Sequence, residues 1–252
     1  MMRGKFNVLF VSSEIRPFVQ GGCTAEFSGT FPKFIKNLGH DIRLMMPNYK
    51  LINERKFVLR DVIRLQGMDI KIADKQIKTN GKSSFLPEAK VQIYFLDNKY
   101  YFDREGLYED PASGKEYKDN PERFMYFCKS CLETLKMLHW QPDVIHCNDW
   151  QTALIPVYLK TLYKEDPFFK NTHTLLTIHD FTTQGNYNFK NNLLAHELES
   201  LGLALEGSFL KDGIRYADLL NTISEAHLQE VLKNEGFNFN LADVLNEKKD
   251  EI

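Results

Sequence analysis

The chain has 252 residues, of which 43% are hydrophobic and 26% are charged, and its formal net charge at pH 7 is -2. This length is enough for one large domain or two small ones, and the near-neutral charge argues against a nucleic-acid or membrane-surface partner. The apolar run at 8–11 is too short to span a bilayer, and no small-residue cleavage site follows it. We therefore expect a cytoplasmic protein that binds neither nucleic acid nor membrane.

Apolar strands and helical segments alternate from the N-terminus. Residues 5–13 form a continuous β-rich run, which is typical of a strand buried on both faces. Residues 24–38 place apolar side chains close to helical spacing, and the run 41–47 predicts the next strand. Pro32 lies within the helical pattern, so an early helix end and a kink are both open there.

The middle of the chain has a different pattern. Residues 57–103 contain strand-like runs separated by polar turns, which predicts a small β-rich excursion of hairpins beside a parallel sheet. Residues 104–120 are polar and rich in turn formers, and we expect a mobile loop there.

Regular alternation resumes after residue 120. Strands joined by helical crossovers imply an α/β fold, a doubly wound parallel sheet with helices on both faces. The expected elements are, in order, helix 121–139, strand 143–148, helix 150–164, strand 172–180, helices near 192–204 and 207–216, strand 218–224 and helix 225–235.

Cys128 and Cys131 form a C-x-x-C pair. Such a pair can be a redox centre or half of a metal site, but no other Cys pair or close His pair completes a ligand set. Residues 120–140 have the pattern of an amphipathic helix, on which positions i and i+3 share a face. We interpret the pair as ordinary helix cysteines and expect no metal.

Polar or glycine-containing stretches directly follow the predicted strands. In an open α/β sheet, ligands bind beyond the carboxyl ends of the strands, so these stretches predict one shared site. The stretches are 12–22, 146–151, 179–187 and 223–227.

The first stretch carries the pair Gly21 and Gly22, which fits neither the dinucleotide nor the P-loop spacing. A glycine pair between strand and helix can let a phosphate approach backbone N–H groups, or it can be a turn that needs positive φ. Glu14 is the nearest candidate carboxylate, with a loop or helix-cap acceptor as its structural alternative.

The second stretch, HCNDWQ, offers side chains that hydrogen-bond sugar hydroxyls, and Trp150 can stack on a sugar face. Asp149 can cap the following helix while its neighbours line a cleft. His146 and His179 stand at adjacent strand ends, which favours a shared site in which His179 forms a second wall. The sequence contains no nucleophile elbow and no H-E-x-x-H motif.

These stretches resemble segments of glycogen and starch synthases, in order along the chain. NVLFVSSEIRPF at 7–18 is similar to the family's opening strand and S-E-x-x-P-F/L turn, and LGHDIRLMMPNY at 38–49 to its L-G-H-D-V-R-x-x-x-P-x-Y. DVIHCNDWQTALIPVYLK at 143–160 resembles D-x-x-H-x-H-D-W-H-T-A-L. LLTIHDFTTQGNY at 175–187 resembles T-I-H-N-x-x-Y-Q-G, and YADLLNTISEAHLQEV at 216–231 resembles Y-A-D-x-x-x-T-V-S.

The resemblance implies a Rossmann-like domain over residues 1–252, one half of a two-domain GT-B architecture whose C-terminal nucleotide-binding domain is absent here. It implies retaining transfer of glucose from ADP-glucose to an α-1,4-glucan or maltooligosaccharide, with no resident cofactor. Two alternatives stay open: a non-catalytic glucan-binding or regulatory module, and a second chain that supplies the missing domain.

The resemblance also assigns roles to individual residues. It places a donor loop beside the phosphates, formed by Gln20, Gly21, Gly22 and Cys23. It places catalytic groups beside the glucose, namely His146, Asp149, Gln151 and His179. It assigns the remaining substrate contacts to Glu14, Asn148, Trp150, Gln184 and Gly185.

Several family positions are changed in this sequence. The lysine of the family's K-T-G-G-L falls on Gln20, and its glycine pair falls on Gly22 and Cys23. The second and third histidines of the family's H-x-H-D-W-H fall on Asn148 and Gln151. Gln20 can hydrogen-bond a phosphate but cannot neutralise it. These changes favour a one-domain homologue over a fragment.

Overall fold

The computed structural model describes residues 4–233 and 240–251. Its main sheet has the strand order β13-β10-β9-β1-β2-β6-β5-β3, with β4 paired to β5. Strands from β13 through to β6 in this order pair in parallel, which confirms the predicted fold class. The strands of this sheet are β1 (Asn7–Val11), β2 (Asp41–Pro47), β3 (Arg60–Asp61), β4 (Met68–Ile72), β5 (Lys75–Leu86), β6 (Val91–Asp97), β9 (Val144–Asn148), β10 (His173–Ile178) and β13 (Leu219–Thr222).

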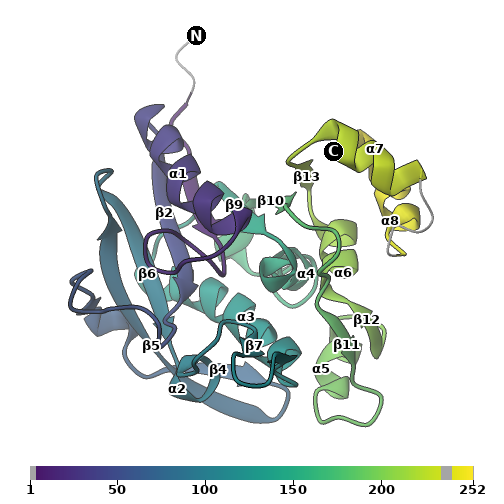
Figure 1. The fold of residues 1–252 in the computed structure, drawn as a ribbon, viewed down its shortest axis with the longest axis horizontal. Helices are drawn as coiled ribbons and strands as arrows, with labels where there is room; N and C mark the ends of the chain where they lie inside the picture. The colour runs from purple at the N-terminus through teal and green to yellow at the C-terminus, as the bar shows by residue number, and fades with distance from the viewer. Residues whose placement is uncertain (1–3, 234–239, 252) are drawn as a thin grey trace.

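Helices connect these strands and cover the sheet (Figure 1). None of the helices in the described parts of the chain is long and apolar enough to cross a bilayer. The α-helices are α1 (Cys23–Asn37), α2 (Lys99–Phe102), α3 (Asn120–Leu138), α4 (Leu154–Lys160), α5 (Ala195–Ser200), α6 (Phe209–Tyr216), α7 (Glu225–Lys233) and α8 (Ala242–Glu247).

Strand β9 shows how the two faces are covered. Successive strand residues point to opposite faces, so His146 and Cys147 do so as well. His146 packs against Phe31 of α1, with ring centroids 5.3 Å apart. Cys147 lies close to Cys131 of α3 on the other side, where α3, α4 and α6 pack together. These two thiols and that of Cys128 are free and buried, as expected of packing residues.

Several helices differ from their predicted bounds. α1 continues past Pro32 without interruption. The helix predicted over 150–164 divides into a 3-10 turn, η2 (Trp150–Thr152), and α4. A small antiparallel pair between β11 (Asn186–Asn188) and β12 (Glu206–Ser208) was not predicted. The last residues of predicted helix 225–235 lie outside the described residues.

The prediction that segment 57–103 lies beside the parallel sheet was wrong in one respect. β6 pairs in parallel with β2, and the 12-residue β5 pairs antiparallel with β6. β6 belongs inside the sheet because its residues are buried or nearly so on both faces. The excursion is therefore a mixed extension of the main sheet.

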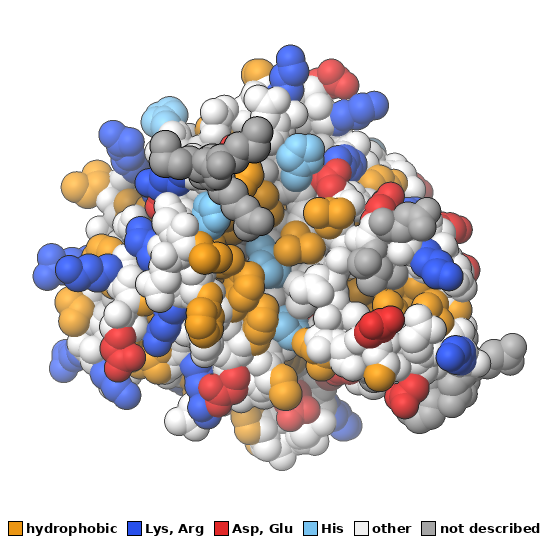
Figure 2. Space-filling view, turned by 90° about the horizontal axis from the view of Figure 1, so that it is seen from above, with side chains coloured by type: hydrophobic (Ala, Val, Ile, Leu, Met, Phe, Trp, Pro, Cys, Tyr) orange, Lys and Arg blue, Asp and Glu red, His pale blue; other side chains and the backbone are white. Residues whose placement is uncertain are grey.

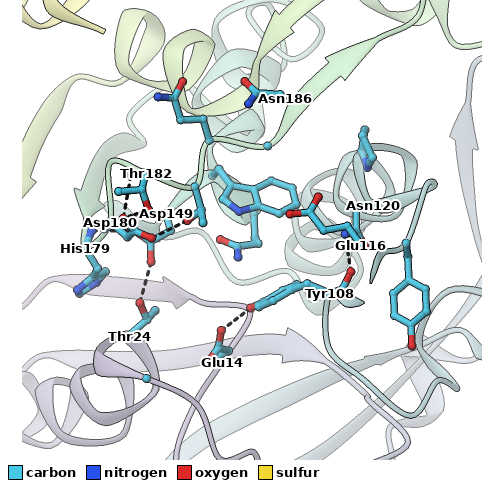
Figure 3. A pocket seen from close by; sticks show the side chains of 18 of the residues that line it. Glu14, Thr24, Tyr108, Glu116, Asn120, Asp149, His179, Asp180, Thr182 and Asn186 are labelled. Carbon is cyan, nitrogen blue, oxygen red and sulfur yellow. Dashed lines mark hydrogen bonds between the residues drawn. The ribbon is translucent and has the colours of Figure 1, made fainter. Parts of the chain in front are cut away.

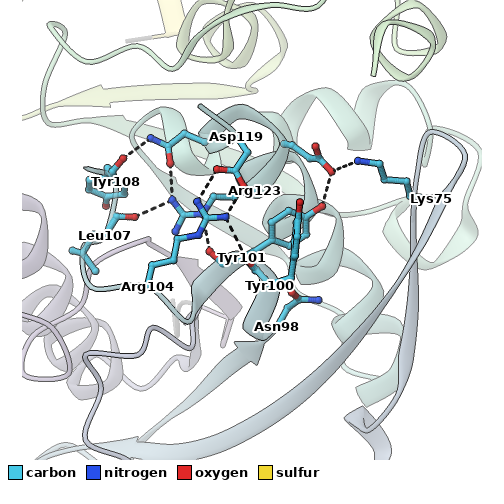
Figure 4. A network of polar contacts seen from close by, with 11 residues as sticks. Lys75, Asn98, Tyr100, Tyr101, Arg104, Leu107, Tyr108, Asp119 and Arg123 are labelled. Atoms are coloured by element: carbon cyan, nitrogen blue, oxygen red, sulfur yellow. Dashed lines mark hydrogen bonds and ion pairs between the residues drawn. The ribbon is translucent and has the colours of Figure 1, made fainter. Parts of the chain in front are cut away.

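Segment 104–120 carries a short hairpin and is held by two arginines (Figure 4). Arg104 pairs with Asp119, with Nη1 2.7 Å from Oδ1. The buried guanidinium of Arg123 donates to the carbonyl oxygens of Tyr101 at 2.8 Å and Leu107 at 3.1 Å. These contacts fix Tyr108, the next residue, against the loop that follows β1. The hairpin strands are β7 (Glu109–Asp110) and β8 (Lys115–Glu116).

Figure 2 looks from above onto the face that carries α1 and α7, where hydrophobic side chains and histidines gather at the centre. Phe34 of α1 and Leu38, which caps the end of that helix, are more than half exposed, as are Leu219 of β13 and Ile223 just beyond it. None of these four side chains lines the pocket described below.

Candidate functional site

A pocket of about 750 Å³ lies beyond the carboxyl ends of β1, β9 and β10 (Figure 3). Its walls are the loop after β1, the start of α1, segment 108–121, the turn after β9 and the loop after β10. Three of the four stretches predicted from strand ends meet there. The fourth, 223–227, contributes no lining residue among those described.

The pocket brings together most of the residues predicted for the site. Gln20, Gly21, His146 and Asn148 do not line it, and Gln20 is exposed. The predicted residues that do line it are Glu14, Gly22, Cys23, Asp149, Trp150, Gln151, His179, Gln184 and Gly185.

Asp149 joins three walls of the pocket. Its carboxylate accepts hydrogen bonds from the backbone N–H of His179 at 2.7 Å and of Asp180 at 3.4 Å, and from the Thr24 hydroxyl at 2.8 Å. It makes no side-chain cap bond to η2, so the predicted capping role is wrong. The left-handed backbone of Asp149, with φ of 57°, instead directs the carboxylate toward the β10 loop. Burial raises its pKa to about 6, although these donors favour the ionised form.

The two predicted histidines lie at different depths. The Nε2 atom of His179 is 3.0 Å from Oδ1 of Asn148, and Nδ2 of Asn148 donates to the carbonyl oxygen of Val11 at 2.9 Å. His146 lies beneath, 2% exposed, with Nε2 2.7 Å from the Thr177 hydroxyl. Burial lowers the pKa of His179 to about 4 and that of His146 to about 3, so both rings are neutral at pH 7. His146 and Asn148 thus support the pocket from below.

Within the glycine pair, only Gly21 has too little space beside it for a side chain. Neither Gly21 nor Gly22 has a positive φ. A Cβ on Gly21 would come within 1.7 Å of Oε2 of Glu14, whereas one on Gly22 would meet open space. A side chain at Gly21 would displace the carboxylate of Glu14 and would also lie 3.0 Å from Cβ of Ala25.

Gly185 lies against the indole of Trp150, and a Cβ there would come within 2.2 Å of Cε3. Its φ of 63° adds backbone strain for any other residue. We expect Gly185→Ala to lower the free energy of unfolding in urea by about 2–4 kcal/mol. Gly202→Ala is the matched control, because Gly202 has a φ of 69° and open space around it. If both variants lose the same free energy of unfolding, the contact with the indole of Trp150 does not explain the need for glycine at position 185.

Part of the pocket was missed from the sequence. The Tyr108 hydroxyl lies 2.6 Å from Oε1 of Glu14 and 2.7 Å from the Ser13 hydroxyl, and so connects segment 104–120 to the loop after β1. The one available signal was a pair of tyrosines within an otherwise polar segment. The missed residues of this wall are Tyr108, Glu116, Tyr117, Lys118, Asn120 and Pro121.

The pocket is rich in hydrogen-bond acceptors and has aromatic walls, so it suits a ligand with many hydroxyl groups. Within the described ranges, no group of three or more His, Cys, Asp or Glu residues is arranged to hold a metal ion. Because Nε2 of the neutral His179 ring donates to Oδ1 of Asn148, Nδ1 is left as the acceptor for a hydroxyl of such a ligand.

The chain is similar to known proteins over nearly its whole length. Residues 7–247 match the family model described as the starch synthase catalytic domain. Glycogen synthase of Chlorobium limicola is 40% identical over 254 residues, which cover 99% of this chain and 52% of the relative. Glycogen synthase of Chlorobium luteolum is 42% identical over 239 residues, 93% of this chain and 49% of the relative. The chain spans about half the length of these relatives.

A solved structure shares the fold. The catalytic domain of starch synthase IV from Arabidopsis thaliana, bound to ADP and acarbose, superposes with a TM-score of 0.84. Its sequence identity to this chain is 22%, and the match covers 98% of this chain and 50% of that one. The observed sheet and helices are therefore those of one half of a GT-B structure.

Proposed function

Because this chain belongs to the starch synthase catalytic domain family, we propose that it forms the sugar-binding half of an α-1,4-glucan glucosyltransferase. The proposed reaction transfers glucose from ADP-glucose to an α-1,4-glucan or maltooligosaccharide with retention and without a resident cofactor. The cytoplasmic location expected from the sequence belongs to the same proposal.

One observation carries the proposal. The carboxylate of Asp149 ties α1 to the loop after β10, and together they line a pocket that is rich in acceptors for sugar hydroxyls. In such a site, positioning of the glucose unit by several hydrogen bonds supplies much of the catalytic effect. His179 and Gln151 are the side chains proposed to contact the transferred sugar.

The leaving diphosphate also needs positive charge, which this half supplies poorly. Gln20 is neutral, exposed and outside the pocket. We propose that a second domain or a second chain provides the basic residues for the diphosphate. The same observation favours the second candidate function, a glucan-binding module without donor chemistry.

The two candidates are separated by measuring ADP release from ADP-glucose with maltooligosaccharide, against a control without acceptor. Acceptor-dependent release supports the transferase. Glucan binding without release, even at high protein concentration, supports the binding module. A chain that neither binds glucan nor releases ADP contradicts both.

If release occurs, Gln20→Lys should raise its rate by about a hundredfold, since a charge placed near the leaving diphosphate stabilises the transition state. Gln20→Met is the matched neutral control and should not raise the rate. No gain from the lysine would contradict the assignment of this loop to the phosphates.

A further inference from the structure

Thr24, the second residue of α1, makes a contact for which the family's motif carries no hydroxyl. Because the family's glycine pair falls on Gly22 and Cys23, the leucine that ends K-T-G-G-L falls on Thr24. A leucine side chain has no hydrogen-bonding atom. In this chain Thr24 lines the pocket, and its hydroxyl donates to Oδ2 of Asp149 at 2.8 Å (Figure 3). The start of α1 is thereby bonded to the turn after β9.

The two oxygens of the Asp149 carboxylate have different donors. Oδ1 accepts the backbone N–H groups of His179 and Asp180. Among the described residues, the Thr24 hydroxyl is the one donor to Oδ2. Asp149 is 6% exposed, so loss of this hydroxyl would leave a buried charged oxygen without a donor from the protein. Thr24 therefore fixes the direction of Oδ2 and favours the ionised carboxylate.

This arrangement leaves Asp149 able to bind a ligand. A carboxylate has about four acceptor positions, two on each oxygen. The backbone donors use those on Oδ1, and Thr24 uses one of the two on Oδ2. The remaining position on Oδ2 can accept a sugar hydroxyl in the pocket. An ionised carboxylate accepts such a bond about twice as strongly as a neutral group does.

The surroundings of Asp149 otherwise disfavour its charge. Burial is the main cause that raises its pKa to about 6, and repulsion from Asp180 adds to it. Repulsion between Asp149 and Glu14 raises the pKa of Glu14 as well. His179 is neutral at pH 7, so it does not compensate these charges. The other side chains of the pocket walls that carry charge or titrate between pH 4 and pH 8 are Glu14, Glu116, Lys118, His179 and Asp180.

We propose that Thr24 is a positioning residue, which keeps the Asp149 carboxylate ionised at neutral pH and directed at a bound sugar unit. The contact between Asp149 and the sugar rests on the proposed function. The control of the charge and direction of Asp149 by Thr24 does not, because it follows from the hydrogen bond within the chain.

The first test follows the carboxyl carbon of Asp149 by ¹³C NMR during a pH titration of the full chain. The signal is identified by its loss in Asp149→Asn. Thr24→Val keeps the shape of the side chain and removes the donor, so the pKa of Asp149 should rise from about 6 to about 7 or higher. Thr24→Ser keeps a donor and should preserve the wild-type pKa. Thr161→Val is the matched control, because the Thr161 hydroxyl donates to the carbonyl oxygen of Val157 outside the pocket.

The second test is calorimetric titration with maltotetraose at pH 7 and pH 9. At pH 7, Thr24→Val should bind maltotetraose about twofold to tenfold more weakly than wild type, because at least about half of its Asp149 carboxylates are protonated. The difference should shrink at pH 9, where Asp149 is ionised in both chains. A merely structural role of Thr24 would weaken binding equally at both pH values.

Two outcomes overturn the proposal. One is an unchanged pKa of Asp149 in a Thr24→Val variant that keeps the wild-type circular dichroism spectrum. The other is a Thr24→Ser variant whose Asp149 titrates as in Thr24→Val. If Thr24→Val does not fold, Thr24→Ala takes its place with the same expected rise in pKa. A wild-type chain that does not bind maltotetraose contradicts the proposed function, while the NMR titration still decides the role of Thr24.

Discussion

Lowering the pH from 7 to 4 should reduce the free energy of unfolding by about 3 kcal/mol through the titration of His146 alone. The pKa of His146 falls from 6.5 to about 3 on folding, chiefly because burial penalises the charged ring. Between these values the unfolded chain binds a proton that the folded chain does not. Stability therefore rises with pH in this window, at about 1.4 kcal/mol per pH unit, and is fully present above pH 6.5.

The measurement is urea unfolding at several pH values for wild type and His146→Gln. Glutamine can keep a hydrogen bond to Thr177 but does not titrate. The free energy of unfolding of the variant should therefore fall less steeply than that of wild type as the pH is lowered. His173→Gln, which removes an exposed histidine from the adjacent strand, is the matched control. If His146→Gln keeps the wild-type slope, the buried imidazole is not the cause of the acid sensitivity.

Two groups near His146 change how steeply the free energy of unfolding of the wild-type chain depends on pH. His179, whose pKa falls to about 4, adds a contribution of the same sign. Asp149 acts in the opposite sense, because its pKa rises to about 6 and the folded chain keeps its proton longer. Its contribution to the free energy of unfolding falls as the pH rises from about 4 to about 6. On acidification from pH 7 to pH 4, the wild-type chain therefore loses less free energy of unfolding than the two histidines alone would remove.

Lys129→Met should lower the free energy of unfolding by about 3–5 kcal/mol, because it leaves a buried carboxylate without its partner. Lys129 of α3 and Glu197 of α5 are 10% and 9% exposed, and Nζ lies 2.9 Å from Oε1. The other oxygen of Glu197 accepts the backbone N–H of Ala73 at 2.9 Å. The pair thereby joins two helices to the turn between β4 and β5.

A double-mutant cycle in urea checks this expectation. Adding Glu197→Gln to Lys129→Met should recover much of the loss, because the amide keeps an acceptor for Ala73 and carries no charge. The exposed pair of Lys190 and Glu206 is the control. Lys190→Met should lower the free energy of unfolding by less than about 1 kcal/mol. If Lys129→Met lowers the free energy of unfolding by no more than Lys190→Met does, the buried carboxylate of Glu197 does not depend on Lys129.

The sequence predicted the location of the pocket better than the direction of its side chains. Apolar runs marked the strands, and the carboxyl-end rule marked the pocket, so Glu14, Gln151 and His179 were found. The direction of Asp149 could not be predicted, because a left-handed φ of 57° interrupts the alternation of the strand. His146 could have been placed beneath the pocket, since neighbouring residues of a strand point to opposite faces.

Contacts between distant parts of the chain were beyond any periodic pattern. The bond between Tyr108 and Glu14 joins residues 94 apart, and that between Lys129 and Glu197 joins residues 68 apart. A lysine in a helical pattern predicts an exposed position unless its partner is known. In segment 104–120 the pair of tyrosines was the one local signal, and it did not identify their partners, because the position of the segment depends on two arginines that bind backbone carbonyls and Asp119.

The central position of β1 also has a consequence for synthesis on the ribosome. β1 pairs with β2 on one edge and with β9 on the other, and the bond from Asn148 to Val11 spans 137 residues. At about 5–20 residues per second, the β9 edge of β1 waits about 7–27 s for its partner. An unpaired apolar strand edge can recruit other nascent chains in that interval. The yield of folded protein should therefore depend on translation speed and chaperone supply as well as on the stability of the finished fold.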